Sequence, residues 1–197
     1  MSYNGYFISG LKAAQADIEK GQKLLAGIPD GAQRAVLNAF NRALTSGKAA
    51  GVKSVRNEYA VRADAVRKSF IMHRASRSNL KAELVSRGGN LPLSRFHYKP
   101  TSDTTGAKRK QIRVEVKKTG LKPLGQAFVW QGKVMQRLGN ERLPIRQAYA
   151  IAVPVMLAHE NVVEDVQTAL IDATRKRMKH EVYRLLQGYE GEAKWRD

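Results

Sequence analysis

The spacing of apolar residues changes twice along the chain, and this restricts the possible folds more than any other feature. In the segments 9–26 and 30–51, apolar residues recur every three or four positions. Alternation of apolar and polar residues dominates from 79 to 147, and the helical spacing returns over 161–187. A period near 3.6 indicates an amphipathic helix and a period of two a half-buried strand. The order is therefore helices, strands, then a long helix, which predicts an α+β fold with an antiparallel sheet.

The two N-terminal segments are expected to pair as a helical hairpin. Gly27 and Pro29 stand between them and end the first helix. Small residues gather near the end of the second segment, at Gly47 and Gly51, which predicts close approach of another backbone. The helical pattern weakens after Val52, and a short helix is expected over 61–68.

The middle of the chain is expected to supply the sheet. The clearest strand pattern is the strict alternation of 111–117, and two runs around Gln131-Gly132 predict a hairpin over 126–137. Pro144 confines the extended run 142–147 to a sheet edge, because proline donates no hydrogen bond. Further extended segments are expected at 70–73, 79–86 and 91–93, and residues 97–110 are expected to form a polar, mobile loop.

We expect a single α+β domain over 30–187, preceded by a helix or arm at 1–29 and followed by a polar tail at 188–197. The longest uncharged apolar run is 148–158, far shorter than the roughly 20 residues of a membrane-spanning helix. This run is predicted to lie in the core, and no membrane partner is expected. The N-terminal sequence lacks the features of a signal peptide.

The large positive charge of the chain is one indication of a partner of opposite sign. Thirty-five Lys and Arg residues oppose 17 Asp and Glu, a net charge of +18. Between residues 104 and 137, nine basic residues are opposed by Glu115 alone. The alternatives are a solvated basic surface and a contact with DNA or an acidic protein, and no base-reading motif is present. The candidate contact residues are Lys108, Arg109, Lys110, Arg113, Lys117, Lys118 and Lys122.

The predicted hairpin and the edge segment after it are candidates for a subunit or protein interface. Trp130 stands beside the hairpin turn, where an aromatic side chain is poorly placed for a core and well placed for contact with another chain. The candidate interface residues are Phe128, Trp130, Lys133, Met135, Arg137, Leu143, Pro144 and Ile145.

No catalytic or metal-binding motif is recognisable. There is no cysteine, and the four histidines show no metal-ligand spacing. His159-Glu160 begins like a zinc-protease H-E-x-x-H motif, but Val163 occupies the last position. We therefore predict a protein that is not an enzyme and binds no cofactor or metal. A metal-dependent nuclease is the remaining catalytic alternative.

Several short pieces in a fixed order resemble the phage minor tail protein Z family. They begin with Asn41-Arg42-Ala43 in the second helix and continue with Leu91-Pro92-Leu93. The most specific are Ala127-Phe128-Val129, Val134-Met135-Gln136-Arg137 and Arg142-Leu143-Pro144-Ile145, ahead of a long C-terminal helix. The resemblance spans residues 34 to 160.

This resemblance implies a structural virion protein of a long-tailed phage. Such a protein completes the end of the tail that meets the head and helps to join the two around the DNA path. The implied assembly is a homo-oligomeric ring, expected to be six-fold, in contact with tail terminator or neck proteins. Its location is the virion tail, assembled in the cytoplasm of the host bacterium. The alternative is a sequence-independent nucleic-acid-binding protein outside any virion.

Overall fold

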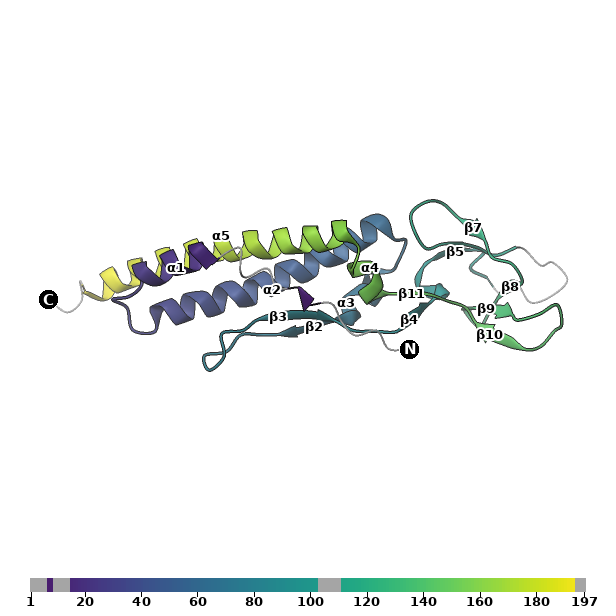
Figure 1. The fold of residues 1–197 in the computed structure, drawn as a ribbon, viewed down its shortest axis with the longest axis horizontal. Helices are drawn as coiled ribbons and strands as arrows, with labels where there is room; N and C mark the ends of the chain where they lie inside the picture. The colour runs from purple at the N-terminus through teal and green to yellow at the C-terminus, as the bar shows by residue number, and fades with distance from the viewer. Residues whose placement is uncertain (1–6, 9–14, 103–110, 194–197) are drawn as a thin grey trace. The chain divides into compact units, whose positions relative to one another are not determined.

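The computed structural model describes residues 7–8, 15–102 and 111–193, and the chain divides into two compact units (Figure 1). Unit 1 comprises residues 1–5, 52–69 and 86–159, and unit 2 comprises residues 6–51, 70–85 and 160–197. Each unit is therefore assembled from stretches that are separated in the sequence.

Unit 2 combines helices with a small sheet. Its helices are α1 (Gln15–Leu24), the first three quarters of α2 (Gly31–Glu58) and α5 (Glu160–Ala193). Its sheet has the strand order β1-β3-β2, in which β1 (Phe7–Ile8) pairs antiparallel with β3 (Glu83–Ser86) and β2 (Phe70–His73) lies on the other side of β3. Helix α1 packs along α5, joined at one point by an ion pair of 2.8 Å between Asp17 and Arg175.

The helices of unit 2 approach one another closely at two glycines. A Cβ atom on Gly47 of α2 would stand 2.5 Å from Cδ2 of Leu170 on α5. A Cβ on Gly21 of α1 would stand 2.5 Å from Cε of Met178 on the same helix. Both distances are far below van der Waals contact, so a larger side chain at either position would require Leu170 or Met178 to shift. The close approach expected near the end of the second helix is thus present at Gly47, with the Leu170 side chain as the neighbour.

One carboxylate lies completely inside unit 2. Glu181 of α5 has no exposed surface and is flanked by the guanidinium groups of Arg177 and Arg184, each at 2.6 Å. The Asn38 side chain of α2 donates a further hydrogen bond of 3.2 Å to it. A buried charge requires such partners, because its desolvation would otherwise cost several kcal/mol.

Unit 1 contains three small antiparallel sheets (Figure 1). One has the order β5-β6-β7, formed by His97–Lys99, Arg113–Glu115 and Lys122–Pro123. A second has the order β10-β9-β8, formed by Ile145–Gln147, Lys133–Arg137 and Ala127–Trp130. The third pairs β4 (Asn90–Pro92) with β11 (Tyr149–Ala152). The short helices are α3 (Ala63–Ser69), α4 (Val153–Leu157) and the 3-10 helix η2 (Leu93–Arg95).

The core of unit 1 is drawn from all of these elements. The end of α2 and the loop after it contribute the buried residues Val55, Tyr59 and Val61. Much of the apolar run 148–158 is also in the core, as predicted. Its buried members are Ala148, Ala152, Val153, Met156 and Leu157. Among the described residues, no helix has both the length and the apolar character needed to cross a membrane.

The predicted α+β class is confirmed: helices, small antiparallel sheets and a long C-terminal helix follow one another in that order. The hairpin around Gln131-Gly132 and the edge strand after Pro144 are also present. The expected mobile loop falls partly on residues 103–110, which lie outside the described residues, and its first three residues form strand β5 instead.

Several boundaries differ from the predictions. Helix α2 continues past Val52 to Glu58, because Val52 and Val55 are buried in unit 1 and extend its apolar face. Helix α5 likewise passes Gly188 and ends at Ala193. Strand β6 stops at Glu115 instead of residue 117, because the chain leaves the sheet there. The Val116 carbonyl accepts a hydrogen bond of 3.0 Å from the Ala60 N–H, in the loop after α2.

Candidate interaction surface

The positive charge of the protein is concentrated in unit 1. Counted over the sequence, unit 1 holds 19 basic and 5 acidic residues, a net charge of +14. Unit 2 holds 16 basic and 12 acidic residues, a net charge of +4. A surface that binds an acidic partner is therefore expected on unit 1.

The first candidate surface is one face of the β10-β9-β8 sheet. The turn between β8 and β9 determines which residues of these two strands lie opposite each other. Gln131 and Gly132 form this two-residue turn, with φ angles of 49° and 70°. Two positive φ values are typical of the type I′ turn, whose twist matches that of the flanking strands. The turn places Trp130 opposite Lys133, and two residues further along each strand Phe128 lies opposite Met135.

The two faces of this sheet differ in burial. Val129 and Val134 lie opposite each other with no exposed surface, and they mark the core side. Since alternate residues of a strand point to opposite sides, the residues next to Val129 and Val134 in each strand lie on the other side. We call this side the hairpin face and define it by Phe128, Trp130, Lys133, Met135, Arg137 and Ile145. Six of the eight candidate interface residues thus share one face.

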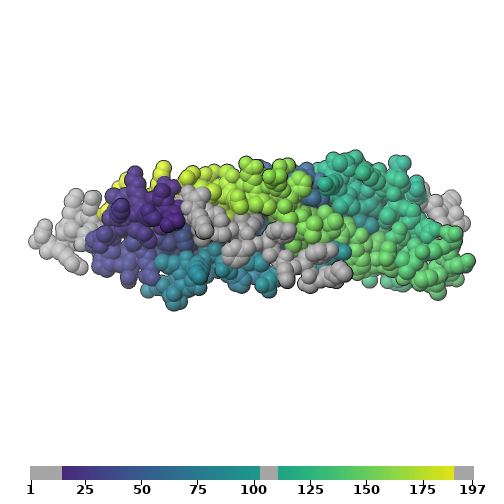
Figure 2. Space-filling view, in the orientation of Figure 1, coloured from purple at the N-terminus to yellow at the C-terminus, as the bar shows by residue number. Residues whose placement is uncertain are grey.

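The hairpin face combines apolar and basic side chains, and it belongs to the part of the chain that is drawn in teal to green in Figure 2. Trp130 is 43% exposed, and Phe128, Met135 and Ile145 are half-buried. The Arg137 guanidinium lies 5.2 Å from the centre of the Phe128 ring, within the range of a cation–π interaction. The other two candidate residues, Leu143 and Pro144, lie just before β10, and Leu143 is 66% exposed. Exposed aromatic, Met and Arg side chains around a common centre are typical of protein interfaces.

Strand β10 forms an edge of the same sheet. The N–H of Leu138 donates to the Pro144 carbonyl at 3.1 Å, and the N–H of Ala148 donates to the Val134 carbonyl at 2.9 Å. Hydrogen-bonded pairs alternate along antiparallel strands, so the backbone groups of Ile145 and Gln147 point away from β9. In the described part of the chain no strand pairs with that outer side. An edge of this kind accepts an extended segment of another chain.

The four described residues among the candidates for contact with DNA or an acidic partner do not share one face. Lys108, Arg109 and Lys110 lie outside the described residues. Arg113 and Lys122 stand on opposite faces of the β5-β6-β7 sheet, because Arg113 lies opposite Pro123 while Lys122 lies opposite Val114. Lys117 follows the end of β6 and places its ammonium group 5.9 Å from the centre of the Tyr59 ring.

Lys118 lies instead on a groove that sequence reasoning did not identify. This groove, of about 360 Å³, lies beside the end of α2 and is lined on its basic side by Arg56, Arg62, His97 and Lys118. We call it the basic groove. Its lining residues come from three separate stretches, joined by the bridges Val61↔Phe96 and Tyr59↔Lys117. These bridges cannot be predicted from any local sequence pattern. Arg56 and Arg62 were therefore not among the residues predicted to contact DNA or an acidic partner.

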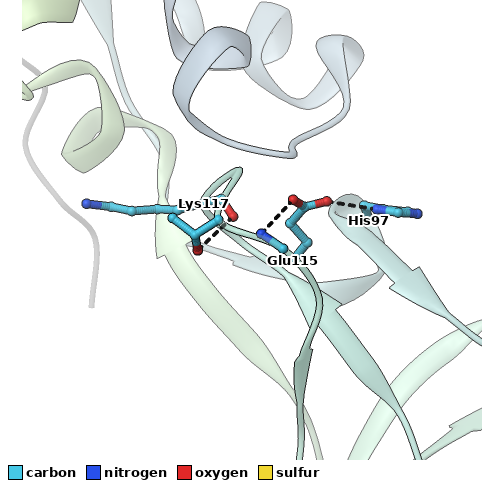
Figure 3. Close-up of polar contacts among 5 residues, drawn as sticks. His97, Glu115 and Lys117 are labelled. Atoms are coloured by element: carbon cyan, nitrogen blue, oxygen red, sulfur yellow. Dashed lines mark hydrogen bonds and ion pairs between the residues drawn. The ribbon is translucent and has the colours of Figure 1, made fainter.

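Glu115 is the carboxylate in the basic groove, and both of its oxygens accept hydrogen bonds (Figure 3). Nδ1 of His97 lies 2.9 Å from Oε2, and the N–H of Gly120 donates to Oε1 at 3.1 Å. The hydrogen bond with His97, aided by that of Gly120, holds the pKa of Glu115 below its usual value, against the effect of desolvation. Burial raises the pKa of Tyr59 at the floor of the groove, and the neighbouring Glu58 carboxylate adds to this.

The comparisons with known proteins add no relative: no family model, curated protein or solved structure matches the chain. Within the described segments, no group of three or more His, Cys, Asp or Glu side chains is arranged to hold a metal ion.

Proposed function

We propose that this protein is a structural component of a phage tail. In this role it completes the head-proximal end of the tail and helps to join it to the head around the DNA path. The proposal rests on the resemblance of residues 34–160 to the minor tail protein Z family. It names assembly, not catalysis, as the activity of the chain.

The observation that carries the proposal is the hairpin face. The most specific pieces of the resemblance are 127–129, 134–137 and 142–145, and these supply the three strands of the β10-β9-β8 sheet or the residues just before them. The same sheet offers an apolar and basic face and an unpaired edge. An assembly subunit needs surfaces of this kind, since a closed ring requires two different and complementary surfaces on each copy.

The surroundings of the hairpin face favour an acidic partner. Between residues 126 and 147, Glu141 is the single acidic residue against Lys133, Arg137, Arg142 and Arg146. Complementary charge speeds association and suppresses wrong partners. We therefore propose that the face contacts an acidic surface of a neighbouring subunit, a tail terminator or a neck protein.

Phage particles offer a direct test. Mass spectrometry of separated tails should detect the protein, and a phage that lacks its coding sequence should accumulate heads and tails that are not joined. Complementation with wild-type protein should restore infectious particles, whereas Trp130→Ala should not. Tyr183→Ala is the matched control, because Tyr183 is an aromatic side chain of unit 2 that is 64% exposed. Absence of the protein from purified tails, or normal joining by Trp130→Ala, would contradict the proposal.

A second candidate function is sequence-independent nucleic-acid binding outside a virion. The net charge of +14 on unit 1 favours it. The mass of the purified protein discriminates between the two functions. A closed oligomer that dissociates on Trp130→Ala supports assembly, and a monomer that binds DNA with a steep salt dependence supports the second candidate.

A further inference from the structure

We infer that the basic groove of unit 1 binds a phosphate group of a nucleic-acid backbone. The inference gives a site to the contact with DNA that the proposed function includes. The inference rests on the proposed function for the identity of the nucleic acid as phage DNA. The binding itself can be measured with the isolated protein.

The groove is held in place by backbone hydrogen bonds between its three stretches. The N–H of Lys118 donates to the Glu58 carbonyl at 2.8 Å, which joins the chain after β6 to the last turn of α2. The N–H of Arg62 donates to the Arg95 carbonyl at 2.9 Å, and that of His97 donates to the Ala60 carbonyl at 3.0 Å. The basic side chains therefore extend from a fixed frame, which lowers the entropic cost of binding an anion.

The groove carries an excess of positive charge. Arg56, Arg62 and Lys118 are exposed cations, and the described residues provide no ion pair for Arg56 or Lys118. Arg62 has one at 3.4 Å with Asp64, a carboxylate that Arg95 also contacts, at 3.0 Å. Glu115 reduces this excess by one charge; its oxygens are hydrogen-bonded to His97 and to the N–H of Gly120, and Lys118 also helps to lower its pKa. Arg and Lys side chains so placed are the usual donors to phosphate oxygens.

The lining of the groove favours a phosphate over a protein partner. Its apolar members are inaccessible: Tyr59 and Phe96 are each 4% exposed and Val61 is 5% exposed. The centre of a protein interface requires exposed apolar or aromatic surface, which the hairpin face has and the groove lacks. Nucleic-acid interfaces are more polar and strongly positive, as the groove is. The sequence contains no base-reading motif, so we expect the binding to be independent of sequence.

The test measures binding of a labelled 20-base-pair duplex of mixed sequence to the full chain by fluorescence anisotropy. The groove variant is the triple substitution Arg56→Gln, Arg62→Gln, Lys118→Gln. The matched control is Arg67→Gln, Lys68→Gln, Arg87→Gln, which removes the same charge from exposed positions of unit 1 outside both the groove and the hairpin face. We expect the groove variant to bind at least 10-fold more weakly and the control less than 3-fold more weakly. The slope of log K against log salt should fall by about 1 for the groove variant, since each neutralised phosphate contributes about 0.9.

Equal losses in the two triple variants would overturn the inference, because binding would then follow total charge. Unchanged binding of the groove variant would also overturn it, as would groove-dependent binding of poly-glutamate without binding of the duplex. Thermal melting checks that each variant is folded, and Arg56→Gln alone replaces the triple variant if that fails to fold. A negative result leaves the assembly proposal standing, since the hairpin face is tested by particle joining and not by DNA binding.

Discussion

The guanidinium of Arg137 lies 5.2 Å from the centre of the Phe128 ring, on adjacent strands of the hairpin face. Arg137 also donates a hydrogen bond of 2.8 Å from Nη1 to the Arg142 carbonyl, so the side chain is held from two directions. This pair ties the ring to the loop that leads into β10. The interaction energy of Phe128 and Arg137 can be measured directly by mutating the two residues.

A double-mutant cycle of Phe128→Leu and Arg137→Gln measures that energy. We expect a coupling energy of about 0.5 to 1 kcal/mol in urea unfolding, as found for partly exposed cation–π pairs. Phe128→Leu with Arg146→Gln is the control cycle, since Arg146 lies on the opposite side of the sheet. Zero coupling in the first cycle would show that the pair contributes nothing to stability.

Gly47 is predicted to resist substitution despite its position inside a helix. Alanine normally stabilises a helix interior by about 1 kcal/mol over glycine. At Gly47 the new Cβ would stand 2.5 Å from Cδ2 of Leu170, so Gly47→Ala should destabilise the protein by about 1 to 3 kcal/mol. Gly188→Ala in α5 is the matched control, because a Cβ there meets nothing within 4 Å and should stabilise. Urea unfolding measures both, and a stable Gly47→Ala variant would show that the two helices separate readily.

Glu181 is predicted to be the most sensitive carboxylate of α5. Glu181→Ala removes the shared partner of Arg177 and Arg184 and leaves an unfilled space in the interior. We expect a loss of about 2 to 3 kcal/mol, below the 3 to 5 of a fully buried pair, because both arginines are partly exposed and can turn toward water. The exposed Glu164→Ala should change stability by less than about 0.5 kcal/mol. If Glu181→Ala and Glu164→Ala lowered the stability equally in thermal unfolding, the prediction for Glu181 would be wrong.

The His97–Glu115 pair predicts a dependence of stability on pH. The pKa of Glu115 is lower in the folded protein than in the unfolded chain, so its ionised form favours folding. This contribution is complete above the usual pKa of a glutamate and is lost as the pH falls through the lowered value. Melting temperatures from pH 7 to pH 3 should therefore fall more for the wild type than for Glu115→Gln, with the two converging at the acid end. The exposed Glu141→Gln should follow the wild-type curve, and parallel curves for Glu115→Gln would show that its pairing has no effect.

The sequence predicts those parts of the fold that short-range patterns determine. The hairpin is an example, since the Gln131-Gly132 turn and the alternation beside it lie within a few residues of one another. The end of α2 was misplaced because the helical pattern weakens after Val52, and the burial of Val52 and Val55 depends on unit 1. Gly47 was expected to be a position of close approach, but its neighbour Leu170 lies 123 residues away, and no local pattern identifies it.

The hairpin face could be predicted from a local sequence pattern, and the basic groove could not. Alternation along β8 and β9 puts most of the hairpin face on one side, so its residues were identified together. The basic groove depends on Val61 meeting Phe96 and on Tyr59 meeting Lys117, at separations of 35 and 58 residues. Strand pairing at that distance follows from tertiary packing, and no periodicity within a single segment encodes it.

The interleaving of the two units has a consequence for synthesis on the ribosome. The apolar side of α2 within unit 2 includes Val36, Phe40 and Leu44. On the same helix, Gly47 lies against Leu170 of α5 and Asn38 donates a hydrogen bond to Glu181. More than a hundred residues must therefore leave the ribosome before this surface is covered, while every stretch of unit 1 has already been made. A nascent chain exposes its helical part longest, and chaperone contact during synthesis should concentrate on α2.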